Sequence, residues 1–437
     1  MRSGTRFDEL VTTFQKVSTL IKTTFVSKVL RGMSVLGFGF IISKLISMVE
    51  ELFVGRYLGI EIYGIYLVVL AISGMLGAFM TLGLPKAVIK LISEKKTLIS
   101  EIPINALYMA FFTAVLVSIP VIVIGSSDNV LHLLGITKVE LLFGYLIGVL
   151  LTIYAVAQSF RLALYEMKYV VVADITYWAI ALAFFVLFHN LMIGLAGICI
   201  GSVTASIILM NKIPLIRSNL SLDSIRSLTP LTTYLSADSV LGISAQQISI
   251  LYLNIIASFS IVGIFGAHSR SSIFVISPLA TIAGMAVYPT FCSIDRRSQM
   301  RVGRYLLYLG PPIIFAVIGI SYLAGLIFLH VFRVQVIASL LLLLSIFSSI
   351  FLYNRIWDKL VTACEGAKIV AWGVLFGTIA FLSVMLLLTP LVGGMMAIAS
   401  GMISNEIVYS VVLLLWFKSN VMNKFKTKTI SNLLHSD

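Results

Sequence analysis

The chain has 437 residues, of which 59% are hydrophobic and 11% charged, whereas about 25% of a typical soluble domain is charged. Its 31 Lys and Arg against 18 Asp and Glu give a net charge of +13. Apolar runs of roughly 20 residues recur, and each is long enough to cross a bilayer core of about 30 Å. This composition predicts an all-α polytopic membrane protein. It excludes a soluble enzyme, a disordered chain and a secreted disulfide scaffold.

Twelve apolar segments follow a basic N-terminal arm, residues 1–31, which lacks the short apolar core of a signal peptide. Their length and aliphatic content predict helices, since the strands of a membrane barrel would alternate over about 10 residues. A long loop at 213–229 divides them into an N-terminal lobe, 32–212, and a C-terminal lobe, 230–417, before a basic tail at 418–437. The segments are Gly32–Phe53, Ile62–Leu84, Pro103–Ile124, Val139–Phe160, Val171–Phe188, Leu191–Lys212, Pro230–Ile256, Ser260–Pro289, Tyr305–Leu329, Val334–Tyr353, Ile369–Leu388 and Gly393–Phe417.

The positive charges alternate in step with these segments. If the N-terminus is cytoplasmic, the external loops hold only Arg56, Lys138 and Arg333 of the 31 Lys and Arg, and only Lys44 and Arg270 lie within helices. Because loops rich in Lys and Arg stay on the cytoplasmic side, this alternation predicts a multi-pass cell-membrane protein with both termini cytoplasmic. Topology therefore explains the basic surplus, and no nucleic-acid partner is expected.

The two lobes have features of one repeated six-helix unit. Tyr63-Gly-Ile-Tyr66 opens the second segment, and Val262-Gly-Ile-Phe265 opens the eighth, 199 residues later. Both segments end near a proline, Pro85 or Pro289, that precedes a basic stretch. Proline and basic residues commonly follow helices, but their recurrence in the same order indicates a duplication. Transporters with parallel six-helix repeats hold their substrate between the repeats.

Three motifs lie in order between residues 43 and 96: Gly55-Arg-Tyr-Leu-Gly59, Glu61-Ile-Tyr-Gly-Ile-Tyr66 and Thr81-Leu-Gly-Leu-Pro-Lys86. This stretch resembles the N-terminal signature of the Wzx-type flippases of lipid-linked oligosaccharides. These flippases form the polysaccharide-exporter branch of the multidrug/oligosaccharidyl-lipid/polysaccharide (MOP) superfamily. The resemblance implies two pseudo-symmetric lobes around a V-shaped cavity that the first, second, seventh and eighth segments line. It also implies alternating-access transport of a glycan linked to an isoprenoid phosphate or diphosphate.

Two cations, Lys44 and Arg270, lie inside predicted helices. A charge at the centre of a membrane helix costs at least about 2.5–3.5 kcal/mol, so such a residue usually faces a cavity or a partner. Lys44 lies roughly 18 Å along the first segment, and Arg270 lies roughly 15 Å below the outer end of the eighth. Related flippases carry cavity cations in the corresponding helices, so the resemblance implies that both contact the substrate phosphate. The alternatives are pairing with an acid such as Glu50 or Asp238, or snorkelling.

Asp238 in the seventh segment and Glu406 in the twelfth are the embedded acids of the C-terminal lobe. Embedded carboxylates carry protons or bind Na⁺ in transporters, so both are candidates for H⁺ or Na⁺ coupling, and no other cofactor is expected. The alternative is a structural ion pair, for Asp238 with Lys44 or Arg270. Glu50 and Glu51 lie close to the outer end of the first segment and are expected to be solvated.

Polar side chains recur on the seventh segment. Gln247 and Asn254 are seven residues apart and share a helix face, whereas Asp238 and Gln246 could share only a broad one. Gln246 and Asn254 are therefore candidates for contact with sugar hydroxyls in the cavity. A hydrogen-bond seam between helices is the alternative.

The function predicted from these features is a flippase that moves a lipid-linked glycan from the cytoplasmic to the outer leaflet for cell-surface polysaccharide biosynthesis. Its partners would be the bilayer, this substrate and the enzymes of glycan assembly. No HExxH, GxSxG or P-loop pattern occurs, so an enzyme is not predicted. The main alternative is a MATE-like, cation-coupled multidrug antiporter, whose cavity would carry acids and aromatic residues. A membrane scaffold or an integral membrane glycosyltransferase is a further alternative.

Overall fold

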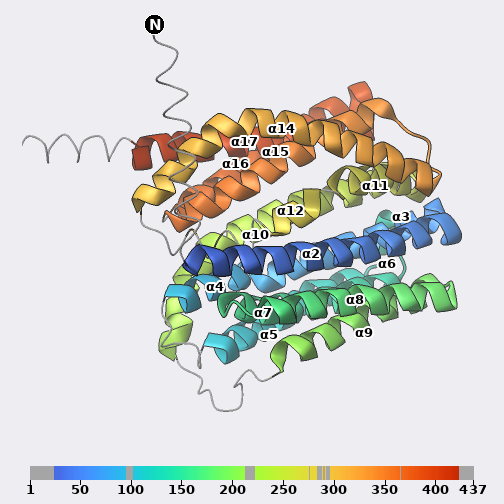
Figure 1. Cartoon of the computed structure of the whole chain (residues 1–437). Helices are drawn as coiled ribbons and strands as arrows, with labels where there is room; N and C mark the ends of the chain where they lie inside the picture. The colour runs from blue at the N-terminus through green and yellow to red at the C-terminus, as the bar shows by residue number, and fades with distance from the viewer. Residues whose placement is uncertain are drawn as a thin grey trace, which may run out of the picture.

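The computed structural model describes residues 24–94, 102–211, 222–274, 276–282, 288, 291, 296–364 and 366–422, and the regular structure within them is helical (Figure 1). The helices of the first half are α2 (Thr24–Phe53), the π-helix η1 (Val54–Leu58), α3 (Ile60–Thr81), α4 (Leu84–Glu94), α5 (Ile102–Ser126), α6 (Asp128–Leu134), α7 (Lys138–Ala163), α8 (Met167–Phe188) and α9 (Leu191–Met210). Those of the second half are α10 (Leu222–Ile256), α11 (Phe259–Ile273), α12 (Ile276–Ile282), α14 (Arg296–Phe332), α15 (Ala338–Ala363), α16 (Ala367–Val392), α17 (Gly394–Trp416) and the π-helix η4 (Phe417–Met422).

Within the described residues, each of the twelve predicted segments falls mainly on helix. In the described part of the chain, nine helices are long and apolar enough to cross a membrane. The other three predicted segments fall on α2, α10 and the pair α11–α12, whose continuation towards Pro289 lies largely outside the described residues. Several helices begin before their apolar run does, because polar residues also continue a helix: α10 starts at Leu222, inside the expected loop 213–229, and α14 starts at Arg296.

Helix α5 has the surface expected of a membrane span. Only 11% of its apolar stretch is buried within the protein, and Phe111, Ile119 and Ile122 are exposed. Soluble proteins rarely leave contiguous apolar surface of this kind uncovered. Lipid is the medium that such a face requires.

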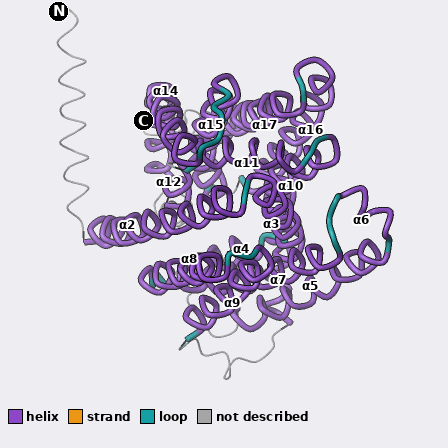
Figure 2. The backbone as a smooth tube through the Cα atoms, turned by 90° about the vertical axis from the view of Figure 1, so that its right-hand side faces the viewer, coloured by secondary structure: helices purple, strands orange, loops and turns teal. Residues whose placement is uncertain are grey.

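The same helix pairs pack together in both halves of the chain. In the first half α2 packs on α8, α3 on α7, and both α7 and α8 on α9. In the second half α10 packs on α16, α11 on α15, and both α15 and α16 on α17. The two groups lie one above the other in Figure 1, and Figure 2 shows them along the helix axes. The repeated pairing confirms the predicted pair of related six-helix lobes.

Two glycines related by the repeat bring α3 and α11 together. A Cβ added to Gly64 would overlap the carbonyl oxygen of Phe259, and one added to Gly263 would overlap that of Ile60. Gly64 and Gly263 are 199 residues apart, as are Ile60 and Phe259, so the two contacts are equivalent under the repeat. Leu67 and Gly266 are also 199 apart and touch each other. A pseudo-twofold axis therefore passes between α3 and α11.

The lobes also meet at the two ends of the bundle, which we call the α3/α11 end, where those helices begin, and the α4 end (Figure 1). At the α3/α11 end, the Phe332 ring lies 5.2 Å from that of Tyr63 and leaves no room for a side chain at Gly55. At the α4 end, Lys86 Nζ lies 4.0 Å from Asp358 Oδ2. Helix α2 begins at the α4 end, and η4 ends there (Figure 1).

We expect Gly64→Ala and Gly263→Ala to lower the melting temperature of the purified protein, because each new Cβ forces backbone apart at the lobe contact. Overpacking of this kind costs about 1–3 kcal/mol. The matched control is Gly319→Ala in α14, where an added Cβ meets nothing within 4 Å. Equal melting temperatures for all three variants would contradict the role given to the α3–α11 contact.

Candidate functional site

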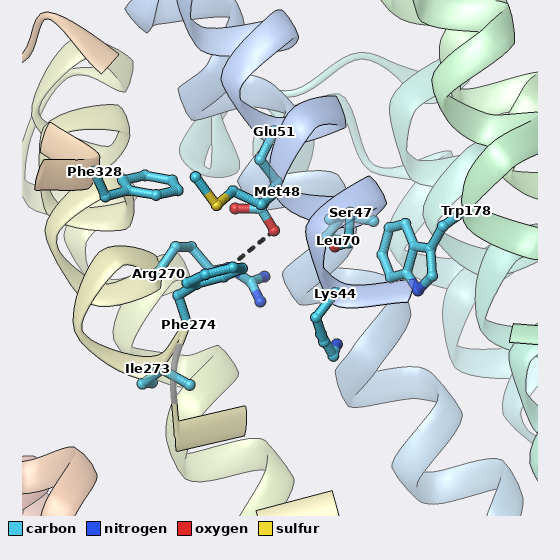
Figure 3. A pocket seen from close by; sticks show the side chains of 10 residues that line it. All are labelled: Lys44, Ser47, Met48, Glu51, Leu70, Trp178, Arg270, Ile273, Phe274 and Phe328. Carbon is cyan, nitrogen blue, oxygen red and sulfur yellow. Dashed lines mark ion pairs between the residues drawn. The ribbon is translucent and has the colours of Figure 1, made fainter. Parts of the chain in front are cut away.

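A pocket of about 90 Å³ lies between the two lobes, lined from one side by α2, α3 and α8 and from the other by α11 and α14 (Figure 3). It is small compared with the about 300–1,000 Å³ of sites that take drug-sized ligands. As it stands the pocket has room for a compact charged group and not for a sugar chain. The residues that line it include Lys44, Met48, Glu51, Trp178, Arg270, Phe274 and Phe328.

Both cations singled out in the sequence line this pocket. Lys44 lies about 14 Å from the end of α2, and Arg270 lies about 16 Å from the start of α11, as the 1.5 Å rise per residue gives. Lys44 Nζ lies 5.6 Å from the centroid of the Trp178 ring, within the range of a cation–π interaction. Among the described residues, no carboxylate forms an ion pair with Lys44. The Arg270 side chain is 47% exposed, so it is open to a ligand.

Arg270 has a partner across the lobe boundary. Its Nε lies 3.7 Å from Glu51 Oε1, and this ion pair joins α11 to α2, as Figure 3 shows. The sequence suggested Asp238 as the alternative partner of Arg270, but the side chain of Asp238 lies outside the described residues. The Glu51 carboxylate is therefore both a wall of the pocket and a link between the lobes.

The expected solvation of Glu50 and Glu51 is wrong. Glu50 is fully buried and Glu51 is 7% exposed, and tyrosine side chains of α3 reach both. The hydroxyl of Tyr66 donates to Glu50 Oε2 at 3.1 Å, and that of Tyr63 donates to Glu51 Oε2 at 3.1 Å. A position near a helix end does not imply exposure here, because Tyr63 and Tyr66 of the Glu61-to-Tyr66 motif reach back to the two acids.

A further acid beside the pocket was missed as a candidate. Asp174 on α8 accepts hydrogen bonds from Ser43 on α2 and from Tyr154 on α7, the second at 3.1 Å. The residue adjacent to Ser43 is Lys44, so this contact fixes the part of α2 that presents Lys44 to the pocket. Asp174 lies only seven residues into α8, and nothing in the sequence shows which neighbouring helices it meets.

Glu406 lies buried between α15 and α17 and does not line the pocket. Asn354 on α15 donates to Glu406 Oε2 at 2.7 Å and to the Glu406 backbone carbonyl at 2.8 Å. Ser410 in turn donates to Asn354 Oδ1 at 2.5 Å. The described geometry is that of a hydrogen-bonded tie between two helices of one lobe.

Among the described side chains, Gln247 and Asn254 of α10 do not line the pocket. Asn254 is buried and donates its amide to the carbonyl of Leu134, so it joins α10 to α6 at the α3/α11 end. Gln247 packs against Gly74 on α3. The side chain of Gln246 lies outside the described residues. For Asn254 the structure therefore favours the hydrogen-bond seam, which was the alternative left open by the sequence.

A second charged cluster joins the lobes at the α4 end. Asp358 on α15 is buried and accepts a hydrogen bond from Lys359 at 2.5 Å and one from Thr362 at 3.2 Å, with Lys86 of α4 nearby. Burial and the neighbouring Lys359 ammonium lower the pKa of Lys86 to about 7, while Asp358 opposes this shift. Lys86 is therefore only partly protonated near neutral pH, at a contact between the lobes.

Comparison with known proteins adds to this geometry. The chain has a fold similar to that of a MATE-family multidrug transporter in an inward-facing conformation, with a TM-score of 0.65, 13% identity, and coverage of 88% of this chain and 96% of that one. It is also similar to the eukaryotic MATE transporter AtDTX14, with a TM-score of 0.64, 14% identity and coverage of 93% and 99%. A MOP-superfamily transporter from Pyrococcus furiosus, described as having a binding pocket of reverse polarity, gives a TM-score of 0.66, 13% identity and coverage of 90% and 95%.

No curated protein sequence matches the chain. The sequence profile of the polysaccharide biosynthesis protein family, however, matches residues 29–295, which is more than half of the chain. The match includes most of α2 and all of α3, α8 and α11 around the pocket. The chain therefore belongs to the polysaccharide biosynthesis protein family and has the multi-pass helical membrane fold of the MOP superfamily.

Proposed function

We propose that the protein is a flippase that moves a glycan linked to an isoprenoid phosphate or diphosphate from the cytoplasmic to the outer leaflet. The observation that carries the proposal is the convergence of Lys44 and Arg270, one from each lobe, on one pocket. A phosphate crossing the membrane needs fixed positive charge at this depth, because bare charge is penalised there. Arg supplies a bidentate fork and Lys a mobile point charge for such a group.

The Glu51–Arg270 pair suggests how binding is coupled to lobe movement. A phosphate that enters the pocket competes with Glu51 for the Arg270 guanidinium, and the two anions repel each other. Binding therefore weakens the link between α2 and α11 and favours separation of the lobes on one side. Release of the phosphate lets Glu51 recapture Arg270 and brings the lobes together again. This exchange is an alternating-access cycle in which the substrate charge opens an ion pair.

The V-shaped cavity belongs to a state with separated lobes and stays a prediction.

Ion coupling by Asp238 or Glu406 is also a proposal. The Glu406 carboxylate is buried and accepts a hydrogen bond from Asn354. Neutralising the residue that carries the ion, by Asp238→Asn or by Glu406→Gln, should remove the dependence of flipping on an imposed H⁺ or Na⁺ gradient. A gradient dependence that is unchanged in one variant excludes that residue as the site of ion coupling.

Enzymes of glycan assembly are the partners that the proposed function implies.

A cation-coupled multidrug antiporter is the second candidate, because Glu51 and the aromatic rings of Trp178, Phe274 and Phe328 also line the pocket. Organic cations bind to such surroundings. Here, however, Glu51 is already paired with Arg270, and Lys44 adds a further positive charge. Export of a fluorescent organic cation by the purified protein, with no flipping of a lipid-linked glycan, would favour this candidate.

The proposed orientation places the α4 end in the cytoplasm, since the described residues there include Lys86, Lys90, Arg161, Arg355 and Lys359. With Cys199, Cys292 and Cys364 replaced by Ala, we expect Asp128→Cys to react with a membrane-impermeant maleimide in intact cells. Lys168→Cys, which is exposed at the α4 end, should react only after permeabilisation. The reverse pattern would contradict the orientation.

For Arg270, we expect Arg270→Ala to slow flipping in proteoliposomes by about 10- to 100-fold, the equivalent of losing a charged hydrogen bond of about 1.5–3 kcal/mol. Arg270→Lys should retain part of the activity, because the charge stays while the fork is lost.

Arg270→Ala also leaves the buried Glu51 without its cation, so we expect a lower yield of folded protein. The double variant Arg270→Ala/Glu51→Gln should restore that yield and still flip as slowly as Arg270→Ala does. If the double variant flips at the wild-type rate, Arg270 does not bind the substrate and its role is structural.

A further inference from the structure

A second pocket, of about 430 Å³, opens at the α3/α11 end of the molecule. One wall comes from η1 of the N-terminal lobe, with Arg56 and Tyr57. The other comes from the turn after α14 in the C-terminal lobe, with Arg333. Both arginines are exposed. The pocket therefore places one guanidinium from each lobe beside a space of the size that small ligands occupy.

The pocket exists only while the lobes are together at this end. Its floor includes Phe332, whose ring packs on Gly55 and lies 5.2 Å from the Tyr63 ring. Arg333 follows Phe332 directly, and its backbone N–H donates to the carbonyl of His330 at 3.1 Å, so the turn that carries it is fixed to the end of α14. Separation of Phe332 from Gly55 would therefore part the two arginines. A ligand that bridges them favours the closed arrangement.

The two arginines stand out among the charges at this end. Of the three Lys and Arg described at this end, Lys138 is paired with Asp128 at 3.0 Å. No carboxylate in the described part of the chain forms an ion pair with Arg56 or Arg333, including the exposed Glu61 close to Arg56 along the chain. Two uncompensated guanidinium groups across a lobe boundary repel each other, and a shared anion removes that repulsion.

Phosphate is the anion that suits this arrangement. A guanidinium presents two parallel N–H donors that match two phosphate oxygens, so two arginines can hold one phosphate or diphosphate group from both sides. We propose that Arg56 and Arg333 form a phosphate-binding site at the α3/α11 end, separate from the Lys44–Arg270 pocket, and that its occupation holds the lobes closed there.

If this end is the outer one, as the proposed function requires, the site takes a phosphate-bearing headgroup of the outer leaflet or a phosphate in solution. Binding by itself does not depend on transport. The site can therefore be tested even if the proposed substrate is wrong.

The test uses the full-length protein in phosphatidylcholine nanodiscs and follows its melting temperature. Inorganic pyrophosphate should raise the melting temperature of the wild-type protein. Arg56→Gln/Arg333→Gln should weaken this response at least tenfold in pyrophosphate concentration. Lys138→Gln, which removes the same charge from the same face outside the pocket, should respond as the wild type does. The Arg270→Ala/Glu51→Gln protein should also respond, because the inner pocket is not involved.

A second arm replaces part of the phosphatidylcholine with phosphatidic acid. A rise in melting temperature that the double arginine variant loses, and that Lys138→Gln retains, identifies the lipid headgroup as the source of the phosphate. A response to pyrophosphate alone identifies a soluble phosphate. The proposal is overturned if the wild-type protein responds to neither ligand, or if the double arginine variant responds as the wild type does.

Discussion

The contact between α3 and α11 is the constraint on which the rest of the structure depends. Gly64 and Gly263 let the two helix backbones touch. Gly64 lies against Phe259 and Gly263 lies against Ile60, and these two partners occupy equivalent positions in the repeats. Because this contact lies on the pseudo-twofold axis, it fixes the position of one lobe relative to the other. The pocket, the Glu51–Arg270 pair and the packing of Phe332 on Gly55 are arranged around it.

The scaffold is symmetric, but the charge placed on it is not. Under the 199-residue offset that relates α3 to α11, the counterpart of Arg270 is the buried Ala71. One lobe therefore contributes a guanidinium where the other contributes a methyl group, and the cations of the pocket come from α2 and α11. A duplicated fold supplies two bodies that can move against each other. Single-residue differences between the copies place the Arg270 charge on one side of the interface only.

Much of the fold could be predicted from the sequence, because membrane helices have strong apolar signals and the loop charges alternate. The same reasoning placed Lys44 and Arg270 at overlapping depths, since helix rise converts sequence position into depth. It failed where neighbouring helices decide the environment: Glu50 and Glu51 were expected to be solvated, but Tyr63 and Tyr66 cover them. For Asn254, the spacing of polar residues predicted a helix face but not the neighbouring helix. In the structure its side-chain amide donates a hydrogen bond to the backbone carbonyl of Leu134.

The most direct test of the central claim is the leaflet in which a lipid-linked glycan lies when the protein is removed from cells that make such a glycan. A membrane-impermeant enzyme or oxidant that modifies the sugar measures the fraction in the outer leaflet. A flippase predicts that this fraction falls on depletion and that the glycan accumulates in the cytoplasmic leaflet, with recovery when the wild-type protein is restored. An unchanged distribution of every lipid-linked glycan would contradict the proposed function.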